Sequence, residues 1–162
     1  MDMFKTLFTK KLITTKEMLK LLEGWEYNTC LGSEHFNKKE YRTAALYFEK
    51  SLAQATFGLS GNKRQETFMQ YYTLASMNLA HALSHYKKLP QSEKVLSDAH
   101  FNMLSMMVDR KQANSFRRLA KVQAELLMQS LRKYLDSIGR AKVADSLEEE
   151  FYRLTVHSQL NA

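Results

Sequence analysis

Cysteine, proline and glycine are scarce in this chain of 162 residues, which contains one cysteine, one proline and five glycines. The single cysteine, Cys30, has no partner in the chain for a disulfide bond, so we expect a reducing, cytoplasmic compartment. A β-sandwich or β-barrel needs a turn about every 8 to 12 residues, and this chain has too few turn-forming residues for that. The composition therefore excludes a disulfide-stapled fold and argues against an all-β one.

Long apolar segments are also missing. No uninterrupted apolar run approaches the roughly 20 residues that a membrane-spanning helix requires, so we expect no membrane span. Hydrophobic residues nevertheless make up 44% of the chain and charged residues 25%, which separates it from disordered proteins. The chain is long enough to bury a core without metal or disulfide bonds, and we expect it to fold.

Residue patterns typical of enzymes do not occur in the sequence. There is no glycine-rich phosphate loop, no nucleophile elbow and no cysteine–histidine arrangement with a supporting acid. Carboxylates are plentiful, but none form the spaced pair that acid–base catalysis uses. We therefore expect no enzymatic activity and no bound cofactor.

Positive charge is in excess, with 24 lysines and arginines against 17 acidic residues and a formal net charge of +7. Such a charge attracts nucleic acid, anionic membranes and acidic peptides alike. Several basic pairs fall near the predicted ends of helices, where the helix dipole favours cations even without a ligand. The pairs are Lys38–Lys39, Lys63–Arg64, Lys87–Lys88, Arg110–Lys111, Arg117–Arg118 and Arg132–Lys133.

Helical periodicity extends over most of the chain. Thr14, with Glu17 three residues later, is a capping-box signature for a helix that continues to about Phe36. Pro90 is suited to the first turn of a helix, and Gly139 to a left-handed helix end. We expect further helices at about 40–56, 65–87, 91–109, 112–137 and 141–158, a flexible loop at 58–66, and an amphipathic arm at 1–13.

One segment carries a family signature. Residues 31–52, LGSEHFNKKEYRTAALYFEKSL, resemble the tetratricopeptide repeat, a helix-turn-helix unit, and the good match spans residues 25–58. Small residues at Gly32 and Ala44 would allow two helices to approach closely, with Phe48 filling the space around the contact. The residues at signature spacings are Leu31, Gly32, Tyr41, Ala44, Phe48 and Leu52.

Two weaker copies follow this repeat. The second copy extends from Leu79 to Ala99, and the third begins at Leu119 and includes the helices on either side of Gly139. The starting leucines of the three copies are Leu31, Leu79 and Leu119, with spacings of 48 and 40 residues. The family's usual period is about 34 residues, so longer helices are expected. The resemblance implies an all-α, right-handed stack of about three helical hairpins with an N-terminal capping helix, as a single domain over residues 1–162.

The stretch MNLAHALSHYKK, residues 77–88, places His81 and His85 on one helix face. A metal site normally needs more ligands, and neither an HExxH nor a CxxC motif occurs, so we expect no metal. The repeat register instead assigns both histidines to a concave groove of the kind in which this family binds peptides. The resemblance implies a polar, basic groove formed by Ser33, Phe36, Asn37, Asn78, His81, His85, Arg117 and Lys121.

The function expected from this groove is binding of a peptide or helix of a partner protein, with an acidic segment favoured by the cations. Alternatives stay open at this point: nucleic-acid binding through the basic pairs, a small secretion-type chaperone with tetratricopeptide repeats, or an ordinary helix surface. A methionine-rich face that follows Phe101 could be core, or could bind a partner helix or form a homodimer. Its methionines are Met103, Met106 and Met107.

Overall fold

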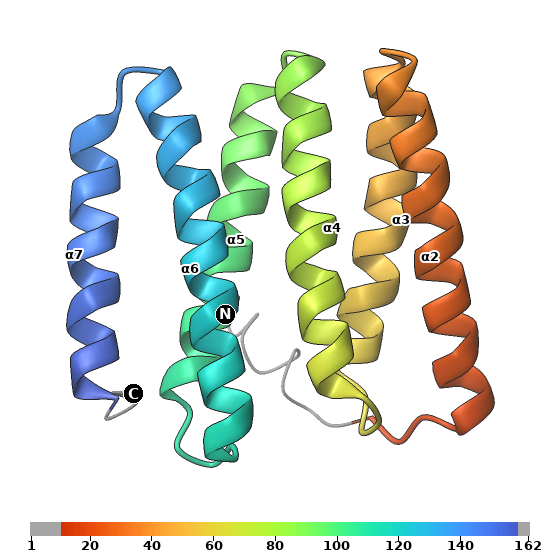
Figure 1. Cartoon of the computed structure of the whole chain (residues 1–162), viewed down its shortest axis with the longest axis horizontal. Helices are drawn as coiled ribbons and strands as arrows, with labels where there is room; N and C mark the ends of the chain where they lie inside the picture. Colours follow the sequence, from red (N-terminus) through yellow and green to blue (C-terminus); the bar gives the residue numbers. More distant parts are fainter. Residues whose placement is uncertain (1–10, 159–162) are drawn as a thin grey trace. The chain divides into compact units, whose positions relative to one another are not determined.

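Residues 11–158 form six α-helices (Figure 1). The computed structural model describes residues 11–158, and across this range the chain forms no strand, apart from one isolated bridge between Lys11 and Gly61. The all-helical prediction is therefore confirmed for these residues, and each helix predicted after residue 13 has an observed counterpart. The helices are α2 (Thr15–Asn37), α3 (Tyr41–Leu59), α4 (Gln65–His85), α5 (Leu89–Val108), α6 (Asn114–Ser137) and α7 (Ala141–His157).

The chain divides into two compact units, Met1–Val95 and Leu96–Ala162. Unit 1 contains α2, α3, α4 and the first turns of α5, and unit 2 contains the rest of α5 with α6 and α7. The boundary thus falls inside a helix. The single domain expected over residues 1–162 stays a prediction.

The start of α2 has the geometry that its sequence predicts. The Glu17 backbone N–H donates to Thr14 Oγ1 at 3.1 Å, and the Thr14 N–H donates to the Glu17 carboxylate at 2.7 Å. These reciprocal bonds satisfy two amides that helix formation leaves without partners. The hydrogen bond from Thr14 also lowers the pKa of the Glu17 carboxyl. The capping-box prediction is confirmed.

Most of the amphipathic arm predicted at 1–13 lies outside the described residues. The part that is described lies against the turn between α3 and α4. The Lys11 N–H donates to the Ser60 carbonyl at 2.9 Å, and the Ile13 N–H donates to Asn62 Oδ1 at 3.0 Å. The Ile13 side chain is buried.

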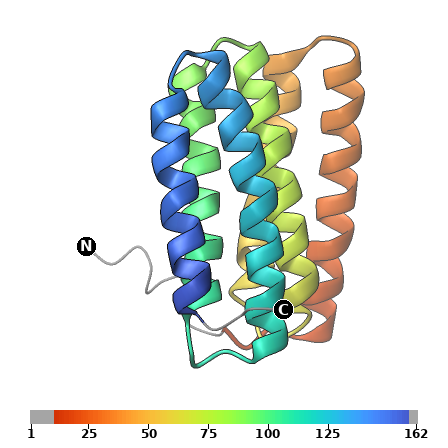
Figure 2. The ribbon, with the colours of Figure 1, turned by 60° about the vertical axis from the view of Figure 1, so that its left-hand side comes forward.

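Consecutive helices of unit 1 run antiparallel and pack side by side, α2 on α3 and α3 on α4 (Figures 1 and 2). The contact between α2 and α3 depends on Gly32, because a Cβ atom there would lie 2.6 Å from the Phe48 ring. The expected close approach at this glycine is confirmed. The helices α2 and α4 also touch, through Trp25 and Tyr71, whose stacked rings have centroids 3.8 Å apart.

A second glycine of unit 1 differs from its prediction. Gly58, expected in a loop at 58–66, lies inside α3 and is buried, and a Cβ atom there would overlap the buried ring of Phe68. The turn between α3 and α4 covers only residues 60–64. A glycine within a helical pattern often marks a loop, whereas at this position it makes room for a ring from the next helix.

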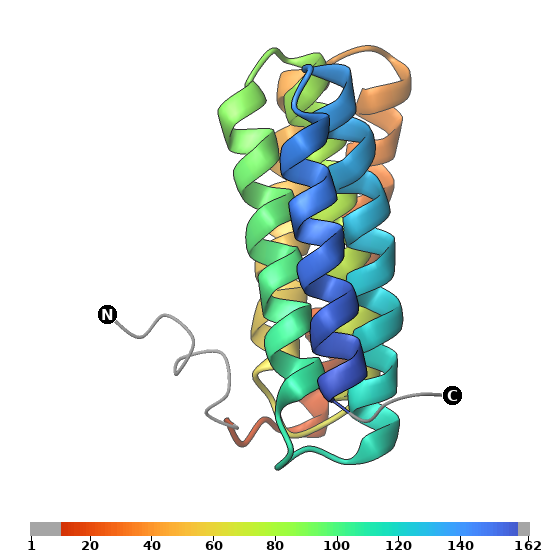
Figure 3. The same ribbon diagram turned by 90° about the vertical axis from the view of Figure 1, so that its left-hand side faces the viewer.

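In unit 2, α7 lies beside both α5 and α6 (Figure 3). Thr155 of α7 approaches the Met107 sulfur of α5 at 3.9 Å, and His100 of α5 lies near the Phe151 ring, with centroids 5.8 Å apart. Met103, Met106 and Met107 are all buried. The idea that these methionines form an exposed binding or dimer face is therefore wrong, because their side chains are already packed inside the protein.

None of the helices within residues 11–158 combines the length and the apolar character needed to traverse a bilayer.

Candidate binding surface

Four aromatic side chains from three helices meet at one end of unit 1. Phe36 lies near the end of α2, Tyr41 begins α3, and His81 and His85 lie in the last turns of α4. The Phe36 ring centroid is 4.8 Å from that of His81 and 5.3 Å from that of His85. Tyr41 stacks on His85 at 4.6 Å. We call these four residues the ring cluster.

The ring cluster rests on the core of unit 1. Phe36 is half-buried and packs against a group of buried residues contributed by α3 and α4. Its ring therefore has one side in the core and touches the histidines as well. A binding surface built on packed helices keeps its geometry better than one built on loops. The buried residues are Ala44, Ala45, Phe48, Leu79, Ala82 and Leu83.

The two histidines of the cluster are exposed and face each other. Their Nε2 atoms are 3.1 Å apart, so one ring N–H can donate to the other ring nitrogen. Desolvation lowers the pKa of His81 below its usual value, and the positive charge that His85 can carry lowers it further. The neutral form of His81 is therefore favoured at neutral pH.

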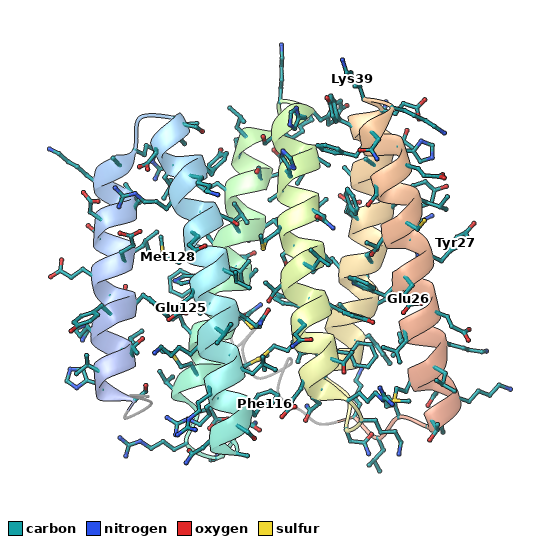
Figure 4. All side chains as sticks on the ribbon, viewed as in Figure 1. Glu26, Tyr27, Lys39, Phe116, Glu125 and Met128 are labelled. Carbon is teal, nitrogen blue, oxygen red and sulfur yellow. The ribbon has the colours of Figure 1, made fainter. Side chains whose placement is uncertain are left out.

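Lys38 and Lys39 follow α2 at the same end of unit 1. The Glu40 N–H donates to the His35 carbonyl at 2.9 Å, and the Lys39 N–H donates to the Phe36 carbonyl at 2.9 Å. This pair of bonds is a Schellman motif, which requires a left-handed residue just after the helix. Lys39 occupies that position, with φ of 62°. Figure 4 shows Lys39 at the tip of the α2–α3 hairpin.

The turn after α4 repeats this arrangement. The Lys88 N–H donates to the Leu83 carbonyl at 2.8 Å, and the Lys87 N–H donates to the Ser84 carbonyl at 3.1 Å. Lys87 is the left-handed residue, with φ of 60°. Because the contacts of the ring cluster bring the ends of α2 and α4 together, the two turns are neighbours. We call the four exposed lysines of these turns, Lys38, Lys39, Lys87 and Lys88, the basic end of unit 1.

Three other predicted groove residues belong to unit 1. Ser33 is exposed, and its hydroxyl donates to the Thr29 carbonyl one turn earlier, at 2.9 Å. Asn37 is exposed at the last position of α2, and Asn78 is half-buried one turn before His81. The structure therefore brings Phe36, His81 and His85 into mutual contact, with the asparagines on the same two helices.

The two remaining groove residues belong to unit 2. Lys121 is half-buried and lies 4.0 Å from the Glu125 carboxylate on the same helix. Arg117 is buried, and its guanidinium donates to the Met107 carbonyl at 2.9 Å and to the Ser158 carbonyl at 3.0 Å. The expectation that Arg117 offers a cation to a ligand does not fit this burial, since those bonds link α5, α6 and the end of α7.

Comparison of the chain with protein-family models, with curated proteins and with solved structures finds no match. The surface is therefore interpreted from its own chemistry.

Two features of this surface were missed in the sequence. Tyr41 lies at a signature spacing of the repeat, which does not indicate that its half-buried ring stacks on His85. The helix dipole and nucleic-acid binding both account for the basic pairs with Lys39 and Lys87, but neither indicates that these two residues follow their helices at the position where glycine is usual. A lysine pair just after a helix, with no glycine nearby, was the available signal for the second feature.

Proposed function

We propose that the protein is a non-enzymatic binding module that holds an acidic segment of a partner protein against the basic end of unit 1 and its ring cluster. The observation that carries this proposal is that four exposed lysines directly follow α2 and α4, whose last turns carry a group of exposed and half-buried rings. Lysines supply charge for carboxylates, and rings supply apolar contact area, which together suit an acidic peptide with an apolar or aromatic anchor.

The conformation of the lysines supports the proposal. A non-glycine residue in the left-handed region costs about 1 kcal/mol relative to glycine. Within residues 11–158 three such residues occur, Lys39, Lys87 and Arg64, and all three are basic. Two of them lie at the basic end, while Arg64 begins α4. Lysine at a left-handed position costs more conformational energy than glycine. A role for the lysine charge in binding would account for this cost.

Helix dipoles at this end do not reverse the sign of the surface. The ends of α2 and α4 carry partial negative charge, but the beginnings of α3 and α5 follow each turn directly and carry partial positive charge. The two contributions offset each other. Glu40, the exposed carboxylate of the α2–α3 turn, pairs with His35, and the four lysines outnumber it. The local potential is therefore positive and favours an acidic ligand.

The resemblance to tetratricopeptide repeats is consistent with this location. In that family the first helix of each repeat lines the peptide groove, and the corresponding helices here are α2 and α4. Three of the four ring-cluster residues come from these two helices. The proposal therefore includes a stack of hairpins of this kind, with the peptide passing the ends of α2 and α4.

The test compares capture of partners by three forms of the chain. The wild type, Lys39→Glu/Lys87→Glu and the control Lys133→Glu/Lys142→Glu are immobilised and exposed to nuclease-treated lysate. The control changes the same charge at exposed positions of unit 2. We expect a protein that the wild type and the control retain and the first variant loses. With the purified partner, the first variant should bind at least about tenfold more weakly.

Nucleic-acid binding is the rival function, because the gathered lysines would attract phosphates too. Recovery that disappears on nuclease treatment, with single-stranded RNA bound by the wild type, would favour this rival. Retention of the same proteins by all three forms would contradict a role for the basic end.

A further inference from the structure

The facing histidines of α4 have the geometry of a metal clip. The Nε2 atoms of His81 and His85 are separated by 3.1 Å. Metal–imidazole bonds are about 2.0 to 2.1 Å long. For one ion bonded to both nitrogens, the nitrogen–metal–nitrogen angle would therefore be about 100°. That angle lies between the values for neighbouring ligands in square-planar and tetrahedral complexes. No backbone movement is needed for both rings to reach one ion.

The rings around the histidines hold them in this orientation. Tyr41 stacks on His85, and Phe36 contacts both histidines. Side chains already held in place lose less conformational entropy when they bind a ligand. Both histidines are exposed, so an ion can reach them from solvent.

We propose that His81 and His85 bind one divalent transition-metal ion through their Nε2 atoms. Imidazole nitrogens suit copper, nickel and zinc and do not suit magnesium or calcium. Within the part of the chain that the structure describes, no third histidine, cysteine or carboxylate joins the pair. The remaining coordination positions are therefore left to water or to a ligand from another molecule. This proposal does not depend on the proposed function.

The Irving–Williams series sets the expected affinity order. With two imidazoles, Cu²⁺ should bind more tightly than Ni²⁺ or Zn²⁺. Lys87 and Lys88 follow His85 within three residues, and their charges repel a cation. Added salt screens this repulsion, so metal affinity should rise slightly with ionic strength. Binding of an acidic peptide to the same end should respond to salt in the opposite direction.

The experiment uses Ni²⁺ alone, added to the isotopically labelled full-length chain at pH 7.5, while the histidine ring resonances are followed by NMR. We expect substoichiometric Ni²⁺ to broaden the resonances of His81 and His85 and to leave those of His157 sharp. His157 is exposed on α7 and serves as an isolated histidine on a helix surface. Mg²⁺ should change none of these resonances.

Calorimetric titration with Ni²⁺ and Zn²⁺ supplies the affinity. Either His81→Ala or His85→Ala should weaken binding at least about tenfold, because one imidazole is lost, whereas His157→Ala should bind like the wild type. Circular dichroism checks that each variant keeps its helices. Equal broadening of all exposed histidines, or affinities within twofold of the wild type in His81→Ala and His85→Ala, would overturn the proposal.

Discussion

The turn after α2 and the turn after α6 have the same hydrogen-bond pattern and differ in the residue at the left-handed position. After α6, the Arg140 N–H donates to the Leu135 carbonyl at 2.8 Å, the Gly139 N–H donates to the Asp136 carbonyl at 3.1 Å, and Gly139 has φ of 75°. The turns after α2 and α4 use lysine instead. Unit 2 thus has the residue that the backbone favours, and unit 1 has one that the backbone tolerates at a cost.

Glycine itself has different tasks in the two units. A Cβ atom at Gly139 would meet no atom within 4 Å, so only its backbone angle matters. Gly32 and Gly58 lie inside helices and are needed because rings from neighbouring helices occupy the space of a side chain. The comparison teaches that Gly32 and Gly58 of unit 1 serve helix contacts, whereas Gly139 of unit 2 forms a turn.

The largest expected effect comes from filling a helix contact in unit 1. Gly58→Ala gains about 1 kcal/mol of helix propensity but pushes a methyl group into the buried Phe68 ring. We expect a net loss of about 2 kcal/mol in the free energy of unfolding, measured by urea denaturation.

Gly24→Ala is the matched control for that substitution. Gly24 also lies inside a helix, but its Cβ atom would meet only the end of the Gln54 side chain, which can move at the cost of its 3.1 Å hydrogen bond from Asn28 Nδ2. The gain in helix propensity offsets this cost, so the variant should be about as stable as the wild type. A similar loss of stability in both variants would show that the ring contact at Gly58 is not the cause.

The histidines allow a second comparison between the units, through pH. His100 of α5 is buried, its Nδ1–H donates to the Ala124 carbonyl at 3.1 Å, and its Nε2 atom has no partner among the described residues. Burial lowers the pKa of His100 below its usual value of 6.5, although the Ala124 hydrogen bond and the Glu150 charge oppose the shift. The unfolded chain therefore binds the proton more readily than the folded chain.

It follows that stability contributed by neutral His100 is fully present above about pH 6.5 and is lost as the pH falls below that value. We expect His100→Phe to reduce the fall in the free energy of unfolding between pH 7 and pH 5. The pKa of His81 is also lowered, so the free energy of unfolding of His100→Phe should still fall somewhat as the pH falls. The exposed His157→Phe should keep the wild-type slope, and an unchanged slope in His100→Phe would contradict the assignment.

The smallest expected effect comes from exchanging the turn residues. Lys39→Gly/Lys87→Gly removes the backbone strain of two left-handed lysines but increases the conformational entropy of the unfolded chain. We therefore expect the free energy of unfolding to rise by less than about 1 kcal/mol. Gly139→Lys should lose about 1 kcal/mol, since it places a side chain at φ of 75°. Thermal unfolding measures both variants. A marked loss of stability in the glycine variant would mean that the lysine side chains stabilise the fold.

Much of this fold could be predicted from local patterns. The capping box at Thr14 and the left-handed end at Gly139 depend on a few neighbouring residues, and both occur as expected. Gly58 and Arg117 could not be placed this way, because their surroundings are contributed by other helices. A glycine beside a ring and an arginine bonded to distant carbonyls look, in sequence, like a loop and a surface cation.

Only the local part of the candidate site could be predicted from the sequence. The spacing of His81 and His85 fixes a shared helix face, but it does not show that Phe36 and Tyr41 complete a ring cluster. Such contacts depend on how the ends of α2 and α4 meet. Lys121 and Arg117 were added by extending a repeat register to a helix of the other unit.

The Schellman turns of unit 1 are closed entirely by backbone atoms, which separates the charge of this end from its architecture. The hydrogen bonds at Lys39 and Lys87 use amide and carbonyl groups, and the ammonium groups take no part in them. Acetylation of either lysine would remove its charge and leave these bonds unchanged. The charge of this surface can therefore vary, through substitution or modification, while the helices that carry it stay the same.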